Sequence, residues 1–135
     1  MPEIIVTLPG TIRIKKNSRR PVQIGGVNKP RRLVILPSAG YVKWEKEARK
    51  DVENQLDGWQ IKGRPLIDPA ASISVKVLAY IQGQMPDLSG ILESVGDCLE
   101  GIIWEDDKQI KSWDGSRVFR VDEVGRARTD VLIVW

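Results

Sequence analysis

One stretch of the 135-residue chain, residues 87–110, constrains the fold more than any other. Its apolar residues recur at steps of three and four, which is the spacing of one face of an α-helix. These residues are Leu88, Ile91, Leu92, Val95, Leu99 and Ile102. Asp87 or Ser89 can cap the start of such a helix, and Gly101 suits the left-handed residue that commonly ends one. The stretch therefore predicts one helix with an acid at its first edge.

Three further acids, Glu105, Asp106 and Asp107, follow this helix after a short turn. A helix of about a dozen residues is roughly 18 Å long, so the chain must fold back if Asp107 is to meet Asp87. If these carboxylates do meet, their like charges repel one another unless a cation is present. Mg²⁺ is the hard cation that prefers oxygen ligands, so the pattern predicts a Mg²⁺ site where the acids converge.

The stretch resembles the signature of the RusA-type Holliday-junction endonucleases, the crossover junction endodeoxyribonuclease family. In that family an Asp-x-Asp pair opens a helix that carries a Lys and then an Asp, and an Asp-Asp-x-Gln element follows. Asp87 matches the first acid of the pair, and Asp97 matches the helix Asp. The last element is matched by Asp106, Asp107 and Gln109.

The resemblance implies a Mg²⁺-dependent endonuclease, with Mn²⁺ as a substitute, that resolves four-way DNA junctions by phosphodiester hydrolysis in recombination and repair. Asp87 and Asp107 are then the catalytic, metal-binding acids, and Asp106 is a further metal ligand. The resemblance also implies a homodimer that acts on branched double-stranded DNA in the cytoplasm of a bacterium or in a phage context.

The sequence differs from the family pattern at two positions. Ser89 stands at the place of the second Asp, and Glu93 stands at the place of the Lys. A hydroxyl is a weaker ligand than a carboxylate, and Glu93 reverses the charge of a lysine. Glu93 and Asp97, four residues apart on one helix, are therefore candidates for a substitute ligand. The alternative function is a relative that binds branched DNA without cutting it.

Each acid also has a purely structural interpretation. Asp87 can serve only as a helix cap, Asp97 can be a solvated helix residue, and the Asp106–Asp107 pair can belong to a simple turn. For Asp87 and Asp107, the agreement of their spacing with the family pattern favours the metal-binding interpretation.

Composition narrows the class of protein further. A chain of 135 residues predicts a single domain, residues 1–135. It contains no His, which removes the usual general base and the commonest zinc ligand. The single Cys98 excludes a disulfide framework and fits a reducing cytosol. No apolar run is long enough to span a membrane, so we expect a cytoplasmic protein without a membrane partner.

Charge is distributed unevenly along the chain. Residues 1–50 contain 12 Lys and Arg but 3 acids, whereas residues 51–135 contain 9 Lys and Arg and 15 acids. A basic half beside an acidic half is expected of an enzyme that grips phosphates and presents carboxylates to a metal. An uneven distribution also arises in many soluble proteins that bind no nucleic acid.

The basic residues concentrate in a segment at about residues 10–37, which is rich in Gly, Pro and Asn. This composition predicts an arm or hairpin that crosses a phosphate backbone. A solvated loop is the alternative. The predicted DNA-binding residues are Lys15, Lys16, Arg19, Arg20, Lys29, Arg31 and Arg32.

The remaining pattern predicts an α+β fold with a mixed or antiparallel sheet of about four or five strands and two main helices packed on it. The expected strands are residues 3–8, 33–36, 73–81, 117–121 and 130–134. Residues 73–81 alternate apolar and other side chains but keep some apolar character on both faces, which predicts the central strand. Ser38 caps the other helix, expected to end near Leu56, with Glu45 and Arg49 as an ion pair on its solvated side.

Overall fold

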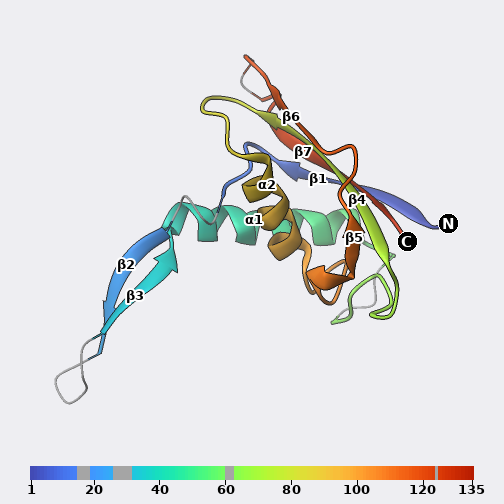
Figure 1. Ribbon diagram of the computed structural model, residues 1–135, viewed down its shortest axis with the longest axis horizontal. Helices are drawn as coiled ribbons and strands as arrows, with labels where there is room; N and C mark the ends of the chain where they lie inside the picture. The colour runs from blue at the N-terminus through green and yellow to red at the C-terminus, as the bar shows by residue number, and fades with distance from the viewer. Residues whose placement is uncertain (15–18, 26–31, 60–62, 124) are drawn as a thin grey trace.

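The computed structural model describes residues 1–14, 19–25, 32–59, 63–123 and 125–135. Two helices and a five-stranded mixed sheet form the body, and a two-stranded hairpin projects from it (Figure 1). The elements in chain order are β1 (Glu3–Pro9), β2 (Arg19–Ile24), β3 (Arg32–Pro37), α1 (Ala39–Gln55), β4 (Ile73–Ile81), α2 (Leu88–Leu99), the short 3₁₀ helix η1 (Asp107–Gln109), β5 (Ile110–Ser112), β6 (Arg117–Arg120) and β7 (Arg128–Val134). The α+β fold expected from the sequence is confirmed.

Strand β4 is the centre of the sheet, as its sequence predicts. It pairs antiparallel with β7 on one side, and β7 pairs antiparallel with β1. On its other side β4 pairs parallel with β5 and β6. The register aligns Val77 with Val131 and Val131 with Val6, so β-branched side chains lie side by side across three strands.

The sequence β4–α2–β5 forms a β-α-β unit, because β5 returns parallel to β4 after the helix. Parallel strands require such a crossover, and here α2 supplies it. Ile110 of β5 pairs with Ile73 at the beginning of β4. As a result, the residues just before β5 lie near the start of β4, whereas the residues that begin α2 follow the end of β4.

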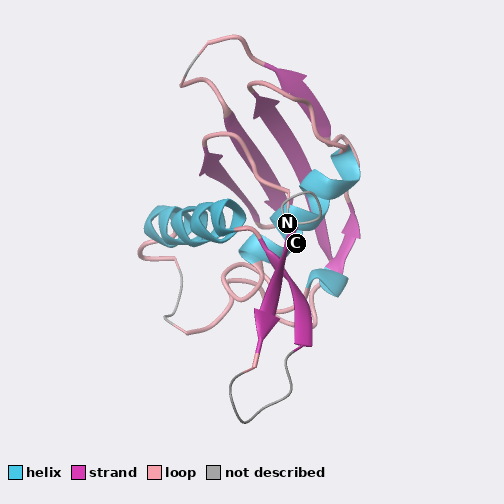
Figure 2. Cartoon of the chain, turned by 90° about the vertical axis from the view of Figure 1, so that its left-hand side faces the viewer, coloured by secondary structure: helices cyan, strands magenta, loops and turns pink. Residues whose placement is uncertain are grey.

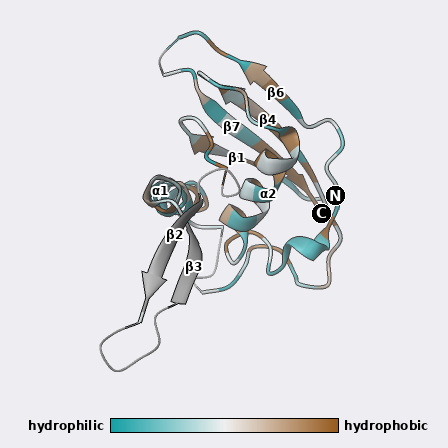
Figure 3. Ribbon diagram, turned by 60° about the vertical axis from the view of Figure 1, so that its left-hand side comes forward, coloured by the Kyte–Doolittle hydropathy of each residue, from teal (hydrophilic) through white to brown (hydrophobic). Residues whose placement is uncertain are grey.

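Both helices lie on one face of the sheet (Figure 3). Alternate side chains of β4, among them Val75 and Val77, are buried in a single apolar core with Val52 of α1 and Val95 of α2. The opposite face of the sheet carries an aromatic stack of Tyr80 on Phe119, with ring centroids 5.1 Å apart. The helices therefore share one core with the sheet, and α2 is held rigidly above β4.

Helix α1 begins as the sequence predicts. The Oγ of Ser38 accepts a hydrogen bond of 3.1 Å from the Tyr41 backbone N–H, which satisfies one of the free donors at the helix start. The buried side of the helix includes Tyr41, Ala48 and Val52. The helix ends at Gln55, one residue before Leu56, which is its C-cap.

The expected ion pair between Glu45 and Arg49 is wrong. Glu45 instead accepts a hydrogen bond of 2.6 Å from the Tyr41 hydroxyl. Arg49 reaches across to the end of α2 and donates to the carbonyl oxygens of Cys98 and Glu100, at 2.7 and 2.8 Å. A guanidinium gains more from two free carbonyls at a helix C-terminus than from an exposed pair along its own helix.

The basic segment forms a hairpin of β2 and β3, which extends away from the sheet and helices (Figures 1 and 2). The two strands pair antiparallel from Arg19 opposite Pro37 to Ile24 opposite Arg32. Of the predicted DNA-binding residues, Arg19, Arg20 and Arg32 lie in these strands, and Lys15, Lys16, Lys29 and Arg31 lie outside the described residues. The hairpin expected from the sequence is present. Within the described ranges, none of the helices has the length and apolar character needed to cross a membrane.

Candidate metal centre

Helix α2 carries one exposed face and one buried face. Ile91, Val95 and Leu99 are buried against the sheet and α1. At 3.6 residues per turn, the other face aligns a set of four positions within about 60° of one another. These positions are Ser89, Glu93, Gly96 and Glu100. Gly96 has no side chain, so it leaves a gap in the middle of this face, and Gly96 itself is buried.

The turn after α2 brings the chain back along that face. Gly101 adopts a positive φ of 85°, and its N–H donates to the carbonyl of Trp104 at 2.7 Å. Trp104 is fully buried, and its indole Nε1 donates to the carbonyl of Gly96 at 3.0 Å. These two hydrogen bonds direct residues 105–107 past the end of the helix and toward Gly96.

Three carboxylates meet at this return. One oxygen from each of Glu100, Asp106 and Asp107 lies within 4.8 Å of the others. Asp107 rests on the gap left by Gly96, because a Cβ on Gly96 would lie 3.6 Å from the Asp107 Cβ. The backbone N–H of Asp107 also donates to Glu100 Oε1 at 3.4 Å. We call these three residues the carboxylate cluster.

Within the cluster, the carboxyl group of Asp106 is stabilised in its charged form. The backbone N–H of Lys108 donates to Asp106 Oδ1 at 2.9 Å and lowers the pKa of this carboxyl. All three side chains are exposed. Ionised carboxylates this close repel one another, so a cation between them is electrostatically favoured.

Gln109 fixes the turn that carries two members of the cluster. Its side chain is buried, and its Oε1 accepts hydrogen bonds from the backbone N–H groups of Glu105 and Asp106 at 3.0 and 3.2 Å. Its Nε2 donates to the carbonyls of Asp68 and Ala71 at 2.9 and 3.2 Å. The amide thus ties the Asp106–Asp107 turn to the connection that precedes β4.

The structure brings together two of the three predicted metal ligands. Asp106 and Asp107 are in the carboxylate cluster, and Asp87 is not. Asp87 is the N-cap of α2 and makes no side-chain capping hydrogen bond. It precedes Gly96 by nine residues, or about 13 Å along the helix axis. The β-α-β connection is the reason, because it places the two ends of α2 at opposite ends of β4. A metal-binding role for Asp87 stays a prediction.

The two candidate substitute ligands occupy different surroundings. Glu93 is exposed and lies on the same face of α2 as Gly96, one turn before it. Asp97 is half-buried and lies near α1, where its charge contributes to raising the pKa of Tyr41 after the larger effects of burial and of Glu45. Their roles as ligands stay predictions, and Glu93 is the one on the face that Asp107 covers.

Sequence reasoning missed Glu100 as a partner of the two aspartates. The available signal is its helical spacing, since Glu100 follows Gly96 by four residues and Glu93 by seven, and so shares their face. Arg49 of α1 stabilises the backbone at Glu100, because its guanidinium donates a hydrogen bond to the Glu100 carbonyl. Gln109 was matched to the family pattern, but nothing in the sequence shows that its amide is buried and fully hydrogen-bonded.

The fold and the site define a small α+β protein with a basic hairpin and an exposed carboxylate cluster at the end of a crossover helix. The family model of the endodeoxyribonuclease RusA matches residues 21–131 of the chain. The chain therefore belongs to the RusA endodeoxyribonuclease family, as its sequence pattern indicated. Comparison with curated proteins gave no match.

The residues of the cluster fit the divalent cation that the resemblance implies. Mg²⁺ binds proteins through one or two carboxylates and keeps water or phosphate oxygens as its other ligands. The cluster offers three carboxylate oxygens, and its exposure leaves room for those other ligands. The absence of nitrogen or sulfur donors among its members favours such a hard cation over zinc.

Proposed function

We propose that this protein is a Mg²⁺-dependent endonuclease that resolves four-way DNA junctions by phosphodiester hydrolysis. The observation that carries the proposal is the carboxylate cluster of Glu100, Asp106 and Asp107 in a chain of the RusA endodeoxyribonuclease family. Mn²⁺, which also takes oxygen ligands, would substitute. The proposed substrate is branched double-stranded DNA in the cytoplasm.

In this mechanism Asp106 and Asp107 hold the metal ion and Glu100 contributes a third carboxylate. A bound Mg²⁺ polarises the scissile phosphate and lowers the pKa of the attacking water. The protein's own part is positional. Gln109 fixes the turn, and Arg49 fixes the end of α2, so the carboxylates do not have to reorganise when metal binds.

Asp87 completes the proposal as the second catalytic acid. It is the N-cap of α2, nine residues before Gly96, and at about 100° per residue it does not share the face that Ser89 and Glu93 occupy. Because α2 is a continuous helix, Asp87 stays about 13 Å from Gly96 along its axis, so Asp87 and Asp107 would contact different parts of one bound DNA. Glu93 lies between them and is the better placed of the two substitute ligands, whereas Asp97 lies near α1.

DNA binding is assigned to the β2–β3 hairpin and its flanking basic residues. If about six of these residues touch phosphates, log affinity falls with log salt concentration at a slope of about −5. A homodimer would present two such hairpins and two clusters to the symmetric arms of a junction. Two coordinated cuts would then resolve it.

The alternative is a relative that binds branched DNA without cutting it. Ser89 and Glu93 favour this alternative, because a hydroxyl is a weak metal ligand and the additional negative charge of Glu93 repels the scissile phosphate. The hairpin supports both functions equally, since phosphate contacts do not depend on a metal.

The deciding experiment follows cleavage of an end-labelled four-way junction with Mg²⁺ or with EDTA. We expect paired nicks with Mg²⁺ alone, their loss in Asp107→Asn, and their retention in Asp114→Asn, a matched change at an exposed aspartate outside the cluster. Tight junction binding without cuts would establish the alternative. Ser89→Asp combined with Glu93→Lys is then the change expected to restore cleavage. The absence of both binding and cleavage would reject both functions.

A further inference from the structure

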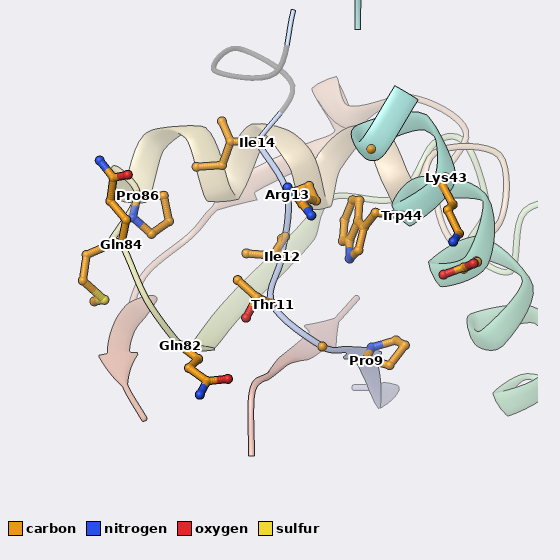
Figure 4. Close-up of a pocket in the computed structure, with 14 residues that line it drawn as sticks. Pro9, Thr11, Ile12, Arg13, Ile14, Lys43, Trp44, Gln82, Gln84 and Pro86 are labelled. Carbon is orange, nitrogen blue, oxygen red and sulfur yellow. The ribbon is translucent and has the colours of Figure 1, made fainter. Parts of the chain in front are cut away.

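A groove of about 1130 Å³ separates the segment after β1 from the start of α1 and from the loop that leads to α2 (Figure 4). Residues 9–14 run along it, with Lys43 and Trp44 of α1 on one wall and Gln82, Gln84 and Pro86 on the other. Its volume exceeds that of most small-molecule pockets, which favours an extended ligand. We call it the strand groove.

The strand groove has a positive wall. Arg13 and Lys43 are exposed there, and neither forms a salt bridge with any residue that the structure describes. The Arg13 guanidinium lies over the first turn of α1, with its Cζ 4.0 Å from the place that a Cβ on Gly40 would occupy. That turn contains no acid, so Arg13 faces the positive end of the helix dipole. An anion between them relieves this repulsion.

The same wall offers an aromatic surface. Trp44 is half-buried beside Tyr41, with ring centroids 5.9 Å apart, and its indole borders the groove (Figure 4). Met85 on the opposite wall is 36% exposed. Nucleobases stack on such side chains without sequence preference. A paired base in a duplex is already covered by its neighbours on both faces, so this surface selects unpaired bases.

The position of the groove links the two parts of the molecule that the proposed function uses. Ile14, from which the chain continues toward the β2–β3 hairpin, lies against Gly90 in the first turn of α2, at the same end of the groove as Pro86, which directly precedes Asp87 (Figure 4). A strand lying in the groove therefore passes the start of α2 at the end from which the chain continues toward the proposed DNA-binding hairpin. Among the described residues that line this path, Glu47 is the one acid.

We propose that the strand groove binds an unpaired stretch of DNA, with phosphates at Arg13 and Lys43 and a base on Trp44. In the proposed function, on which this inference rests for its substrate, the stretch is the strand that leaves the branch point. Positive groups beside an aromatic platform are the combination that single strands require. The groove adds selectivity for branched DNA to the non-selective phosphate contacts of the hairpin.

The test measures binding of a fluorescent oligothymidine of twelve nucleotides. EDTA is present, so that no divalent metal ion contributes to binding. We expect the single changes Arg13→Gln and Lys43→Gln to weaken binding several-fold and Trp44→Leu to weaken it roughly tenfold. Lys46→Gln is the matched control, because Lys46 is an exposed lysine of α1 that does not line the groove. It should change binding less than twofold.

A second measurement guards against variants that fail to fold. A junction carrying 5-iododeoxyuridine next to the branch is irradiated with the unmodified protein, and the cross-linked peptide is identified by mass spectrometry. We expect a cross-link at Trp44. Three results would each overturn the proposal: the unmodified protein fails to bind the oligothymidine, the groove variants and the control bind it equally well, or every cross-link lies outside the groove. Failure of junction cleavage would not, because both measurements omit the metal step.

Discussion

Asp107 lies directly on Gly96 of helix α2. A Cβ added to Gly96 would meet the Asp107 Cβ at 3.6 Å and its Oδ2 at 3.7 Å, which is ordinary van der Waals contact. Asp107 therefore covers Gly96, which is buried, and this face of α2 becomes the floor of the carboxylate cluster.

The first prediction concerns this contact. Gly96→Ala should raise the free energy of unfolding by up to about 1 kcal/mol, because alanine favours a helix and the methyl group fits. Gly96→Leu should displace Asp107 and abolish metal-dependent cleavage. Gly90→Ala is the contrast in the same helix, because its Cβ would lie 2.9 Å from Ile14 Cγ2 and should lower stability. Urea unfolding and junction cleavage measure these effects, and equal stability of the two alanine variants would contradict the prediction.

The second prediction tests Gln109 as the residue that positions the cluster. Gln109→Met keeps the side-chain length but leaves four backbone groups without their partner, so we expect a loss of about 2 kcal/mol in stability. At temperatures where the variant is folded, cleavage should need a higher Mg²⁺ concentration while junction affinity is unchanged. Asn54→Met, which replaces an exposed amide of α1 outside the cluster and the strand groove, should leave stability and the Mg²⁺ requirement as they are.

The third prediction concerns the bridge between the two helices. Arg49 donates to the carbonyls of Cys98 and Glu100 at the end of α2. Arg49→Met removes a charged donor from both carbonyls, and we expect the free energy of unfolding to fall by about 2 kcal/mol. The neighbouring change Lys50→Met removes a charge at an exposed position and should have an effect below about 0.5 kcal/mol. If both variants lost a similar amount of unfolding free energy, Arg49 would have no specific role in capping α2.

The fourth prediction is a loss of stability at alkaline pH. Burial, with smaller contributions from Glu45 and Asp97, raises the pKa of Cys98 to about 12, and burial with the Glu45 hydrogen bond raises the pKa of Tyr41. The unfolded chain ionises these groups at their ordinary pKa values, so their contribution is complete below about pH 8.5 and declines as pH rises toward the folded values. Urea midpoints should therefore fall from pH 8 to pH 11. Cys98→Ala should show a shallower decline, and an identical slope would contradict this account.

Much of the fold was predictable because its signals are local. The alternation in residues 73–81 identified the central strand, and Ser38 identified the start of α1. The short strand β5 was missed, since three residues carry no periodicity of their own. Its pairing with β4 depends on the crossover helix between them, which is a tertiary effect.

The candidate site was predictable only in part. The presence of Asp106 and Asp107 as adjacent acids shortly after the helix followed from the spacing along the chain. Two features were beyond the sequence. The β-α-β connection separates Asp87 from Asp107, and Glu100 joins the cluster because the turn at Gly101 folds the chain onto its own helix. Both depend on the direction in which the chain returns, which residue spacing does not specify.

The central claim is that the acids at the end of α2 hold a divalent cation. Its most direct test is a titration of Mn²⁺ followed by electron paramagnetic resonance for the unmodified protein, Asp107→Asn, Asp87→Asn and the control Asp114→Asn. We expect Asp107→Asn to weaken Mn²⁺ binding at least tenfold, a loss of about 1.4 kcal/mol, and the control to bind as the unmodified protein does. A loss in Asp87→Asn as well would add that acid to the site. Unchanged Mn²⁺ binding by Asp107→Asn would contradict the claim.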